Sequence, residues 1–401
     1  MPNIFDYLIW RGDLSFRTAP FNEVDNLILS MLSFIEYRNI VPSALLGTPV
    51  RLSECLRRYE ENFPAGEDFG VIVPGETTDL FRRAASSERF SEIYAAYYVN
   101  ITDEAEPMQF AAITYILPDN SVFIAFRGTD DSLAGWREDF NLSFTCPIRS
   151  QELAAAYVAD VASVYRGDIR IGGHSKGGNL SVYAAAFVPS YVQPRIVNAY
   201  SNDGPGFLGH VLDSAEYRAI AGRVVTFVPQ SSVIGMLLEH DGDYRVIEST
   251  IHNGLFQHDP FSWSVVGPQF IHLDGLSRQV KRNDQVLRSW LSKLDGDERR
   301  KFTETLFSVL ESTGAKTVSD LTEGRLNSIA VILRTFGHLE RETKDQVYEF
   351  IKRLAESAVV RNFPNILQVL NLVFTPRSSA VFTPCRIVSF IEFLIFCDFH
   401  V

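Results

Sequence analysis

The sequence predicts an α/β fold in which a mostly parallel sheet is flanked by helices and followed by a helical C-terminal extension. Apolar, strand-like runs alternate with helical stretches between about residues 110 and 250, as in sheets built from β-α crossovers. A glycine-rich turn joins one such run to an alanine-rich helix. Beyond about residue 281 only helical periodicity remains, which indicates an appended helical region.

Length and composition are those of a globular chain. The 401 residues are 46% hydrophobic and 21% charged, so the chain can bury a large core, and we expect one catalytic domain with an appendage. The formal net charge of −12 argues against a nucleic-acid partner, because phosphate binding requires a basic face. Composition leaves the oligomeric state open.

The cysteines indicate neither a metal site nor a disulfide framework. They lie far apart, without CxxC or Cys/His ligand spacing. The four are Cys55, Cys146, Cys385 and Cys397. We therefore expect free thiols in a reducing cytoplasm and no metal or other cofactor.

No segment has the pattern of a signal peptide or a membrane span. The N-terminal residues 1–16 lack a basic region before their short apolar stretch. The most apolar tail segment, residues 387–399, is too short to span a bilayer and contains Glu392 and Asp398. A cytoplasmic protein without a transmembrane segment is expected.

The first part of the chain, about residues 1–108, is expected to be helical or looped. Within it, apolar residues at helical spacing predict an amphipathic helix over residues 21–35. Two strand-like runs follow, 110–117 and 122–126, around the turn Pro118-Asp119-Asn120, which predicts an antiparallel hairpin.

The centre of the chain then alternates between helices and strands. The segment 151–165 is predicted to be a helix that ends near Gly167, because glycine can adopt a positive φ without strain. The predicted elements after it are a strand at 169–171, a turn at 172–178, a helix at 179–187, and strands at 196–200, 224–228 and 244–249.

A domain boundary is placed near residue 280. Residues 1–280 form the predicted catalytic domain, and residues 281–401 form the helical extension. In the extension, Asp297 can cap a helix that runs to Ser312 before Gly314. Residues 343–358 have a second helical period.

The strongest functional signal is the sequence Gly173-His174-Ser175-Lys176-Gly177, a GxSxG motif between a predicted strand and a predicted helix. This context is typical of the nucleophile elbow of α/β-hydrolases. The serine needs glycine on both sides because it sits on a sharp, strained turn. The turn exposes the hydroxyl, and the backbone N–H of the next residue, Lys176, can stabilise an oxyanion. The alternative is a glycine-rich turn with an incidental serine.

A second motif lies upstream. The chain reads FRGTDDSLAGWREDF over residues 126–140 and GGHSKGGNL over residues 172–180. Here it resembles the class-three lipases, whose marks are an FRG[ST] strand end, a following WxxD and then GHSxGG. Lys176 is the one residue that departs from this lipase pattern, because those lipases usually have an apolar residue at its position. The resemblance covers about residues 110–270, and the whole chain is most similar to poorly characterised bacterial relatives of these lipases.

The resemblance implies roles for two residues of the upstream motif. Thr129 would supply a second oxyanion donor through its backbone N–H, with its hydroxyl as a further candidate donor, and Asp139 would hold that loop by a hydrogen bond. Two convergent donors can lower the barrier by several kcal/mol. The alternative for Asp139 is an ordinary surface carboxylate.

The general base is expected after the last strand, because the chain order of this fold is serine, acid, histidine. His252 and His258 are the candidates. His258 is favoured because it lies on a loop shortly before an aromatic residue, as does the base of the resembled lipases. The side chain of His174, beside the nucleophile, should point away from the serine hydroxyl.

The acid is where the chain departs from the expected pattern. After the strand at 224–228 the sequence is Pro229-Gln230-Ser231-Ser232, without a carboxylate. Asp203, which follows the strand at 196–200, can instead reach the histidine from the neighbouring strand end. Its alternative is a surface Asp-Gly turn. Asp241, Asp243 and a serine-histidine dyad stay open.

Two further features bear on the substrate pocket. The apolar run 233–238 follows a strand end, where an acyl-binding wall or lid would lie, although core packing explains it equally well. The side chain of Lys176 is expected to face solvent from the first turn of its helix, and less often to meet an anionic group of the substrate.

These residues predict a serine hydrolase that cleaves carboxylic esters through an acyl-enzyme on Ser175, with small-molecule or lipid esters as substrates. Acyl transfer or thioester hydrolysis uses the same nucleophile and oxyanion hole, so the sequence does not separate them. The third alternative is a non-catalytic binding protein on a degenerate hydrolase fold, which a missing acid would favour.

Overall fold

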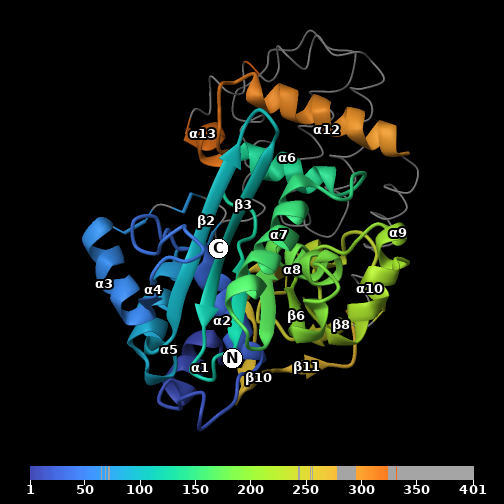
Figure 1. The fold of residues 1–401 in the computed structure, drawn as a ribbon. Coiled ribbons are helices and arrows are strands. Elements are labelled where there is room, and N and C mark those ends of the chain that lie inside the picture. The colour runs from blue at the N-terminus through green and yellow to red at the C-terminus, as the bar shows by residue number, and fades with distance from the viewer. Residues whose placement is uncertain are drawn as a thin grey trace.

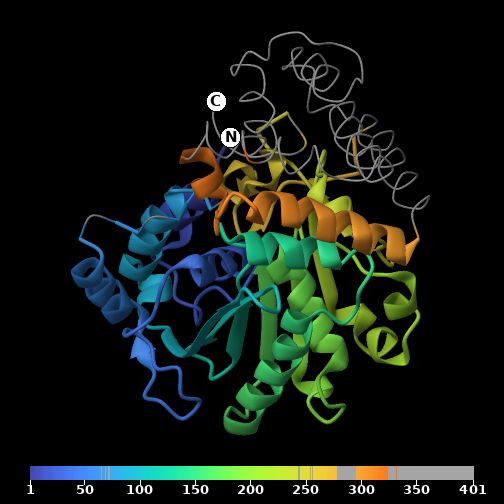
Figure 2. The same ribbon diagram turned by 90° about the horizontal axis from the view of Figure 1, so that it is seen from above.

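The structure is a computed structural model of the chain. The residues it describes are 1–277 and 295–323, apart from Ala65, Asp68, Val71, Ile72, Asp243, Asn253 and Leu255, together with Val331. A large central sheet is covered by helices on both faces (Figure 1). Helix α12 (Gly296–Glu311) lies along helix α6 (Leu133–Asn141) in both views (Figure 2).

The main sheet has nine strands among the described residues, in the order β1-β2-β3-β4-β5-β6-β7-β8-β11. The strands are β1 (Val50–Arg51), β2 (Tyr94–Asp103), β3 (Met108–Ile116), β4 (Val122–Phe126), β5 (Ile169–His174), β6 (Ile196–Asn202), β7 (Val224–Pro229), β8 (Tyr244–Ile247) and β11 (His272–Leu273). Strands β4 to β8 run parallel, whereas the strands outside them pair antiparallel. The α/β prediction is therefore confirmed, with a parallel centre and antiparallel margins. Strands β9 (Val265–Val266) and β10 (Gln269–Phe270) form a separate antiparallel pair.

Strand β4 shows why the centre of the sheet is buried on both faces. Phe123 and Ala125 belong to one apolar core, whereas Val122, Ile124 and Phe126 belong to another. Successive side chains of a strand point to opposite faces, so each face needs its own cover. Helices α2 (Glu23–Met31) and α4 (Glu76–Ser86) contribute to the first core, and α7 (Arg149–Val164) and α8 (Lys176–Phe187) to the second.

The predicted hairpin is confirmed, because β3 and β4 pair antiparallel from Ile116 opposite Val122 onward. At its turn Asn120 adopts a positive φ of 63°. The expected end of the helix before β5 was wrong in detail. Helix α7 ends at Val164 through the extended residue Tyr165, and Gly167 does not adopt a positive φ. Glycine is needed at position 167 for a different reason, because a Cβ there would lie 2.1 Å from the Asn120 carbonyl oxygen.

The N-terminal part contains more than helices and loops. Its helices are α1 (Ile4–Arg11), α2, α3 (Leu52–Asn62), α4 and α5 (Glu88–Ser91), but the ten-residue strand β2 also belongs to it. The expectation of a purely helical or looped segment up to residue 108 was therefore wrong. Strand β2 is defined by its pairing with β3, a contact that the local pattern of β2 does not reveal.

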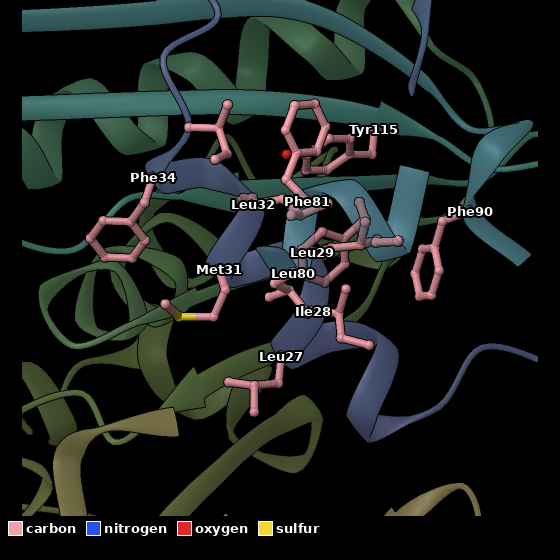
Figure 3. Packing of buried hydrophobic residues seen from close by; sticks show 14 of the residues in the cluster. Leu27, Ile28, Leu29, Met31, Leu32, Phe34, Leu80, Phe81, Phe90 and Tyr115 are labelled. Carbon is pink, nitrogen blue, oxygen red and sulfur yellow. The ribbon is translucent and has the colours of Figure 1, made fainter. Parts of the chain in front are cut away.

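Helix α2 and the following 3₁₀ turn (Leu32–Phe34) confirm the helix predicted over residues 21–35, but the segment is not amphipathic. Every residue from Val24 to Met31 is buried, and Figure 3 shows apolar side chains leaving this segment in several directions. Its polar side chains find partners inside the core. Asp25 forms a fully buried ion pair with Arg89, at 2.5 Å.

The C-terminal helices pack against the sheet domain. Helix α12 begins after Asp295, which caps it in place of the expected Asp297, and Gly314 follows with a φ of 83°. Phe307 of α12 contacts Phe140 of α6 edge-on, with ring centroids 5.5 Å apart. The other α-helices among the described residues are α9 (Gly209–Leu212), α10 (Ala215–Ile220) and α13 (Val318–Glu323). The helix expected at 343–358 and the boundary expected near 280 lie outside the described residues.

Candidate active site

The GxSxG motif forms a sharp turn between β5 and α8. Ser175 has φ 59° and ψ −132°, a conformation that a residue with a side chain rarely adopts. A Cβ on Gly173 would lie 2.3 Å from the Gly177 carbonyl carbon, and one on Gly177 would lie 2.1 Å from the Phe126 carbonyl oxygen. Both glycines are therefore required by close backbone approach. Ser175 is half-buried at the carboxyl end of β5.

Asp203 follows β6 at the same edge of the sheet, and Ser175 N–H donates to the carbonyl of the neighbouring Asn202, at 3.0 Å. Asp203 is fully buried and has a positive φ of 53°, so it does not form the surface turn considered as its alternative. Its Oδ2 accepts a hydrogen bond from Nδ1 of His258, at 2.7 Å.

The strand end that lacks a carboxylate contributes in another way. Ser232, after β7, donates its hydroxyl to Oδ1 of Asp203, at 2.6 Å, and accepts the Gly235 N–H, at 3.0 Å. Both oxygens of Asp203 are thus hydrogen-bonded. Sequence reasoning missed Ser232 because it searched this strand end for an acid.

His258 lies in a 3₁₀ turn, Phe256–His258, with its side chain 21% exposed. Its ring centroid is 4.4 Å from that of His174, the residue before Ser175. His174 Nε2–H donates to the His258 carbonyl, at 2.8 Å. Burial, and then the nearby His258, hold the pKa of His174 well below its usual value, so His174 is a neutral support for this turn.

The loop around His258 is fixed by two buried side chains. Gln257 accepts the Ser231 N–H, at 2.6 Å, and the Trp263 indole N–H donates to the Gln257 carbonyl, at 2.8 Å. Burial raises the pKa of the next carboxyl, Asp259, to about 6. The other candidates for base and acid lie apart: His252 and Asp241 are exposed, and Asp243 is outside the described residues.

On the other side of Ser175, Thr129 follows β4 and is buried. Its hydroxyl donates to Oδ2 of Asp139 on α6, the contact that the resemblance implies. Desolvation raises the pKa of Asp139 to about 6, against the opposing effects of Lys176 and of the Thr129 hydrogen bond.

The expectation that the Lys176 side chain faces solvent was wrong. The residue is 1% exposed, and its ammonium group donates to the Gln109 carbonyl, at 3.0 Å, and to Glu138 Oε2, at 3.1 Å. Sequence reasoning also missed Glu138. The available signal was a lysine directly after the nucleophile together with an adjacent acidic pair, Glu138 and Asp139, whose proximity in space only the fold reveals.

The apolar run 233–238 forms a 3₁₀ turn, Ile234–Met236, that covers the acid. A Cβ on Gly235 would lie 2.0 Å from Oδ1 of Asp203, so the turn packs directly on that carboxylate. Met236 packs in a small core cluster with Val228. A role in binding an acyl chain stays a prediction.

Neither a metal cluster nor a membrane helix is found where the structure describes the chain. Over those residues, no group of three or more His, Cys, Asp or Glu side chains is arranged to hold an ion. None of the described helices is long and apolar enough to cross a membrane. Of the four cysteines, Cys55 and Cys146 are described, and both are free thiols.

Comparison with known proteins gives one family and several distant structures. No curated protein matches the chain. Among solved structures, the chain is similar to the M37 lipase (13% identity, TM-score 0.33, over 52% of this chain and 68% of that one). It is also similar to the propeptide complex of the Rhizomucor miehei lipase, with 13% identity and a TM-score of 0.31 over 56% of this chain and 68% of that one. A deletion mutant of that complex matches with 14% identity and a TM-score of 0.33 over 61% of this chain and 79% of that one.

The family match spans the part of the chain that contains the site. The model of the Mbeg1-like family matches residues 84–308, from the end of α4 through most of α12. This stretch is more than half of the chain and includes both sequence motifs and His258. The protein therefore belongs to the Mbeg1-like family.

Proposed function

We propose that this protein is a serine hydrolase with an α/β-hydrolase fold, and that it cleaves carboxylic esters through an acyl-enzyme on Ser175. His258 is the general base and Asp203 the acid that orients it. The backbone N–H groups of Thr129 and Lys176 stabilise the oxyanion, and Asp139 supports the Thr129 loop.

The observation that carries this proposal is the hydrogen bond between Asp203 and His258, at 2.7 Å, beside the strained Ser175 turn. An aspartate at Nδ1 fixes the imidazole tautomer, so that Nε2 is free to accept a proton. The 4.4 Å contact between the His258 and His174 rings brings that imidazole next to the nucleophile turn.

The chemistry follows from these roles. Ser175 Oγ forms a bond to the acyl carbon while its proton passes to His258 Nε2, and the oxyanion accepts hydrogen bonds from the two N–H donors. The acyl–oxygen bond then breaks, and the alcohol leaves with the proton from His258. Water, deprotonated by His258, then attacks the acyl carbon. The bond between the acyl carbon and Ser175 Oγ breaks, and His258 returns its proton to Oγ as the acid leaves.

Lipid or short acyl esters are the proposed substrates, on the basis of the resemblance in both motifs to lipases. The non-catalytic alternative was favoured by the apparent lack of an acid, whereas the Asp203–His258 hydrogen bond supports a catalytic role. Acyl transfer or thioester hydrolysis would use the same residues, and no contact in the site favours either.

The test is labelling with a fluorophosphonate probe, followed by a panel of esters of increasing acyl length. We expect the wild type to be labelled and Ser175→Ala to lose both labelling and turnover without a lower melting temperature, because the change removes only a half-buried hydroxyl. Ser163→Ala, which alters an exposed serine of α7, is the matched control and should behave as wild type. Labelling that survives in Ser175→Ala would refute the proposal.

A further inference from the structure

A cluster of charged groups lies behind the proposed oxyanion donors, with Lys176 and Glu138 buried and Asp139 partly exposed, and the function proposed above gives it no role beyond Asp139. It contains one ammonium group, that of Lys176 on α8, and two carboxylates of α6, those of Glu138 and Asp139. Asp130, which follows β4 and pairs with Arg127 at 2.9 Å, adds a third carboxylate whose charge is felt at Asp139. Burial of such charges is costly unless they are paired and hydrogen-bonded.

Glu138 is the fixed member of this cluster. One oxygen accepts the Gln109 N–H of β3, at 3.1 Å, and the other accepts the Ser150 N–H of α7, at 3.0 Å. The carboxylate is therefore held by two backbone donors from separate elements. The Lys176 ammonium, 3.1 Å away, ties the start of α8 to this point.

Asp139 connects the cluster to the oxyanion loop. Its Oδ1 is buried without a hydrogen-bond partner and faces the Lys176 ammonium at 3.7 Å. Its other oxygen, Oδ2, accepts the hydroxyl of Thr129. A continuous path thus runs from Lys176, whose N–H is one proposed donor, through Asp139 to Thr129, whose N–H is the other.

We propose that the Lys176 side chain is a positioning residue of the oxyanion hole: its ammonium group, held on Glu138, keeps Asp139 ionised and in place, so that Thr129 is held at a fixed position relative to Ser175. This inference rests on the proposed function. Lys176 thereby acts twice, with its backbone as a donor and with its side chain through Asp139.

The arrangement predicts a particular pH dependence. Three charged groups face Asp139: Lys176 favours its anion, whereas Glu138 and Asp130 oppose it. Loss of the ammonium charge should therefore raise the pKa of Asp139 further, so the acid limb of kcat should move to higher pH. Charge removal elsewhere should leave that limb in place.

The experiment compares three variants with the wild type on an ester that the wild type cleaves. Lys176→Met keeps the backbone N–H and the length of the stem but removes the charge. Lys176→Met with Glu138→Gln removes both ions together, which avoids an unpaired buried carboxylate if the single variant folds poorly. The matched control is Lys316→Met, because Lys316 pairs with Glu104 on the surface.

We expect Lys176→Met to lower kcat at least tenfold with KM changed less than threefold, and to move the acid limb upward by at least half a pH unit. The double variant should also have a low kcat. The acid limb of its kcat–pH profile should lie between those of the single variant and the wild type, because the negative charge of Glu138, which disfavours the Asp139 anion, is removed as well. Lys316→Met should match the wild type. A wild-type kcat and limb in a folded Lys176→Met or double variant would overturn the inference.

Deuterium exchange separates failure of this inference from failure of the proposed function. If the wild type neither cleaves esters nor reacts with the probe, the proposed function has failed, and exchange of backbone amides in residues 127–133 still tests the positioning. Faster exchange there in Lys176→Met, but not in Lys316→Met, supports the role of the ammonium group. Unchanged exchange overturns it.

Discussion

The two sides of Ser175 are built differently. On the base side, Asp203 is hydrogen-bonded by Ser232 and His258, and the His258 ring rests against a neutral His174. On the oxyanion side, the Lys176 ammonium faces the carboxylates of Glu138 and Asp139. The proposed base side thus has one carboxylate, Asp203, hydrogen-bonded to His258, with Asp259 next to His258 in the chain, whereas the proposed oxyanion side has an ammonium group among several carboxylates.

This difference suits the two tasks. A base must gain and lose a proton in every turnover, and the hydrogen-bonded Asp203 balances the charge that His258 gains. Oxyanion donors must stay still, and charge pairs fixed by backbone hydrogen bonds are rigid partners for them. We therefore infer that the base side transfers the proton and that the oxyanion side, with Asp139 ionised, sets the geometry.

The two sides are also covered by segments that lie far apart in the sequence. Near His258, Phe5 of α1 stacks on Phe261 with centroids 5.3 Å apart, and the Asn3 side chain donates to the Phe261 carbonyl, at 2.9 Å. Helix α6 is covered by α12, and Arg299 of α12 donates to the Ser143 carbonyl, at 2.6 Å. Segments far apart in sequence thus support the two sides independently.

The largest effect should come from removing the carboxylate that is hydrogen-bonded to His258. Asp203→Asn removes the carboxylate that orients His258, and the same replacement in a well-studied serine protease lowers kcat about ten-thousandfold. We expect a fall of about three to four orders of magnitude in kcat/KM, measured with a reactive ester. Activity within a few-fold of wild type would show that Asp203 only shapes the turn before Gly204.

A smaller effect is expected on the oxyanion side from Asp139→Asn. Loss of the anion that accepts the Thr129 hydroxyl should lower kcat about tenfold to a hundredfold and change KM little, since a displaced donor harms the transition state more than the bound ester. An unchanged kcat in steady-state assays would make Asp139 an ordinary carboxylate.

The same variant should differ from wild type in stability, with a definite sign. Burial raises the pKa of Asp139 to about 6, so the folded state binds its proton more tightly than the unfolded chain does. Ionisation of Asp139 therefore costs stability, and this cost grows as pH rises from about 4 to 6. Thermal melts at pH 7.5 should show Asp139→Asn at or above the wild-type melting temperature, and the difference should shrink toward pH 4.

The smallest effect should come from the neutral partner on the base side. Ser232→Ala removes one of two hydrogen bonds to Asp203 but leaves its charge and its bond to His258, so we expect kcat/KM to fall only about threefold to tenfold. Ser231→Ala is the matched control, because the Ser231 hydroxyl bonds to Ser277 instead. A loss as large as that of Asp203→Asn would contradict the division between charged and neutral partners.

Local patterns in the sequence were sufficient for much of the site. The strained turn at Ser175 and the hairpin at Asn120 each depend on residues close together in the chain, whose types constrain the backbone directly. The helix after residue 295 was predicted from a similar pattern, although its cap is Asp295 and not the expected Asp297. The upstream motif likewise predicted the contact between Thr129 and Asp139, ten residues apart, that the structure contains.

What only the tertiary structure decided depends on contacts between distant segments. Strand β2 is formed by its pairing with β3. The Lys176 side chain is buried because it pairs inside the fold with Glu138, which is 38 residues away in sequence. Ser232 and Asp203 meet across 29 residues, and Asp203 and His258 across 55. The sequence by itself determined which residue types could perform acyl chemistry and where the chain must turn. It could not determine which of several carboxylates and histidines meet, because side-chain burial and pairing are properties of the packed chain, and a local pattern contains no information about its distant partner.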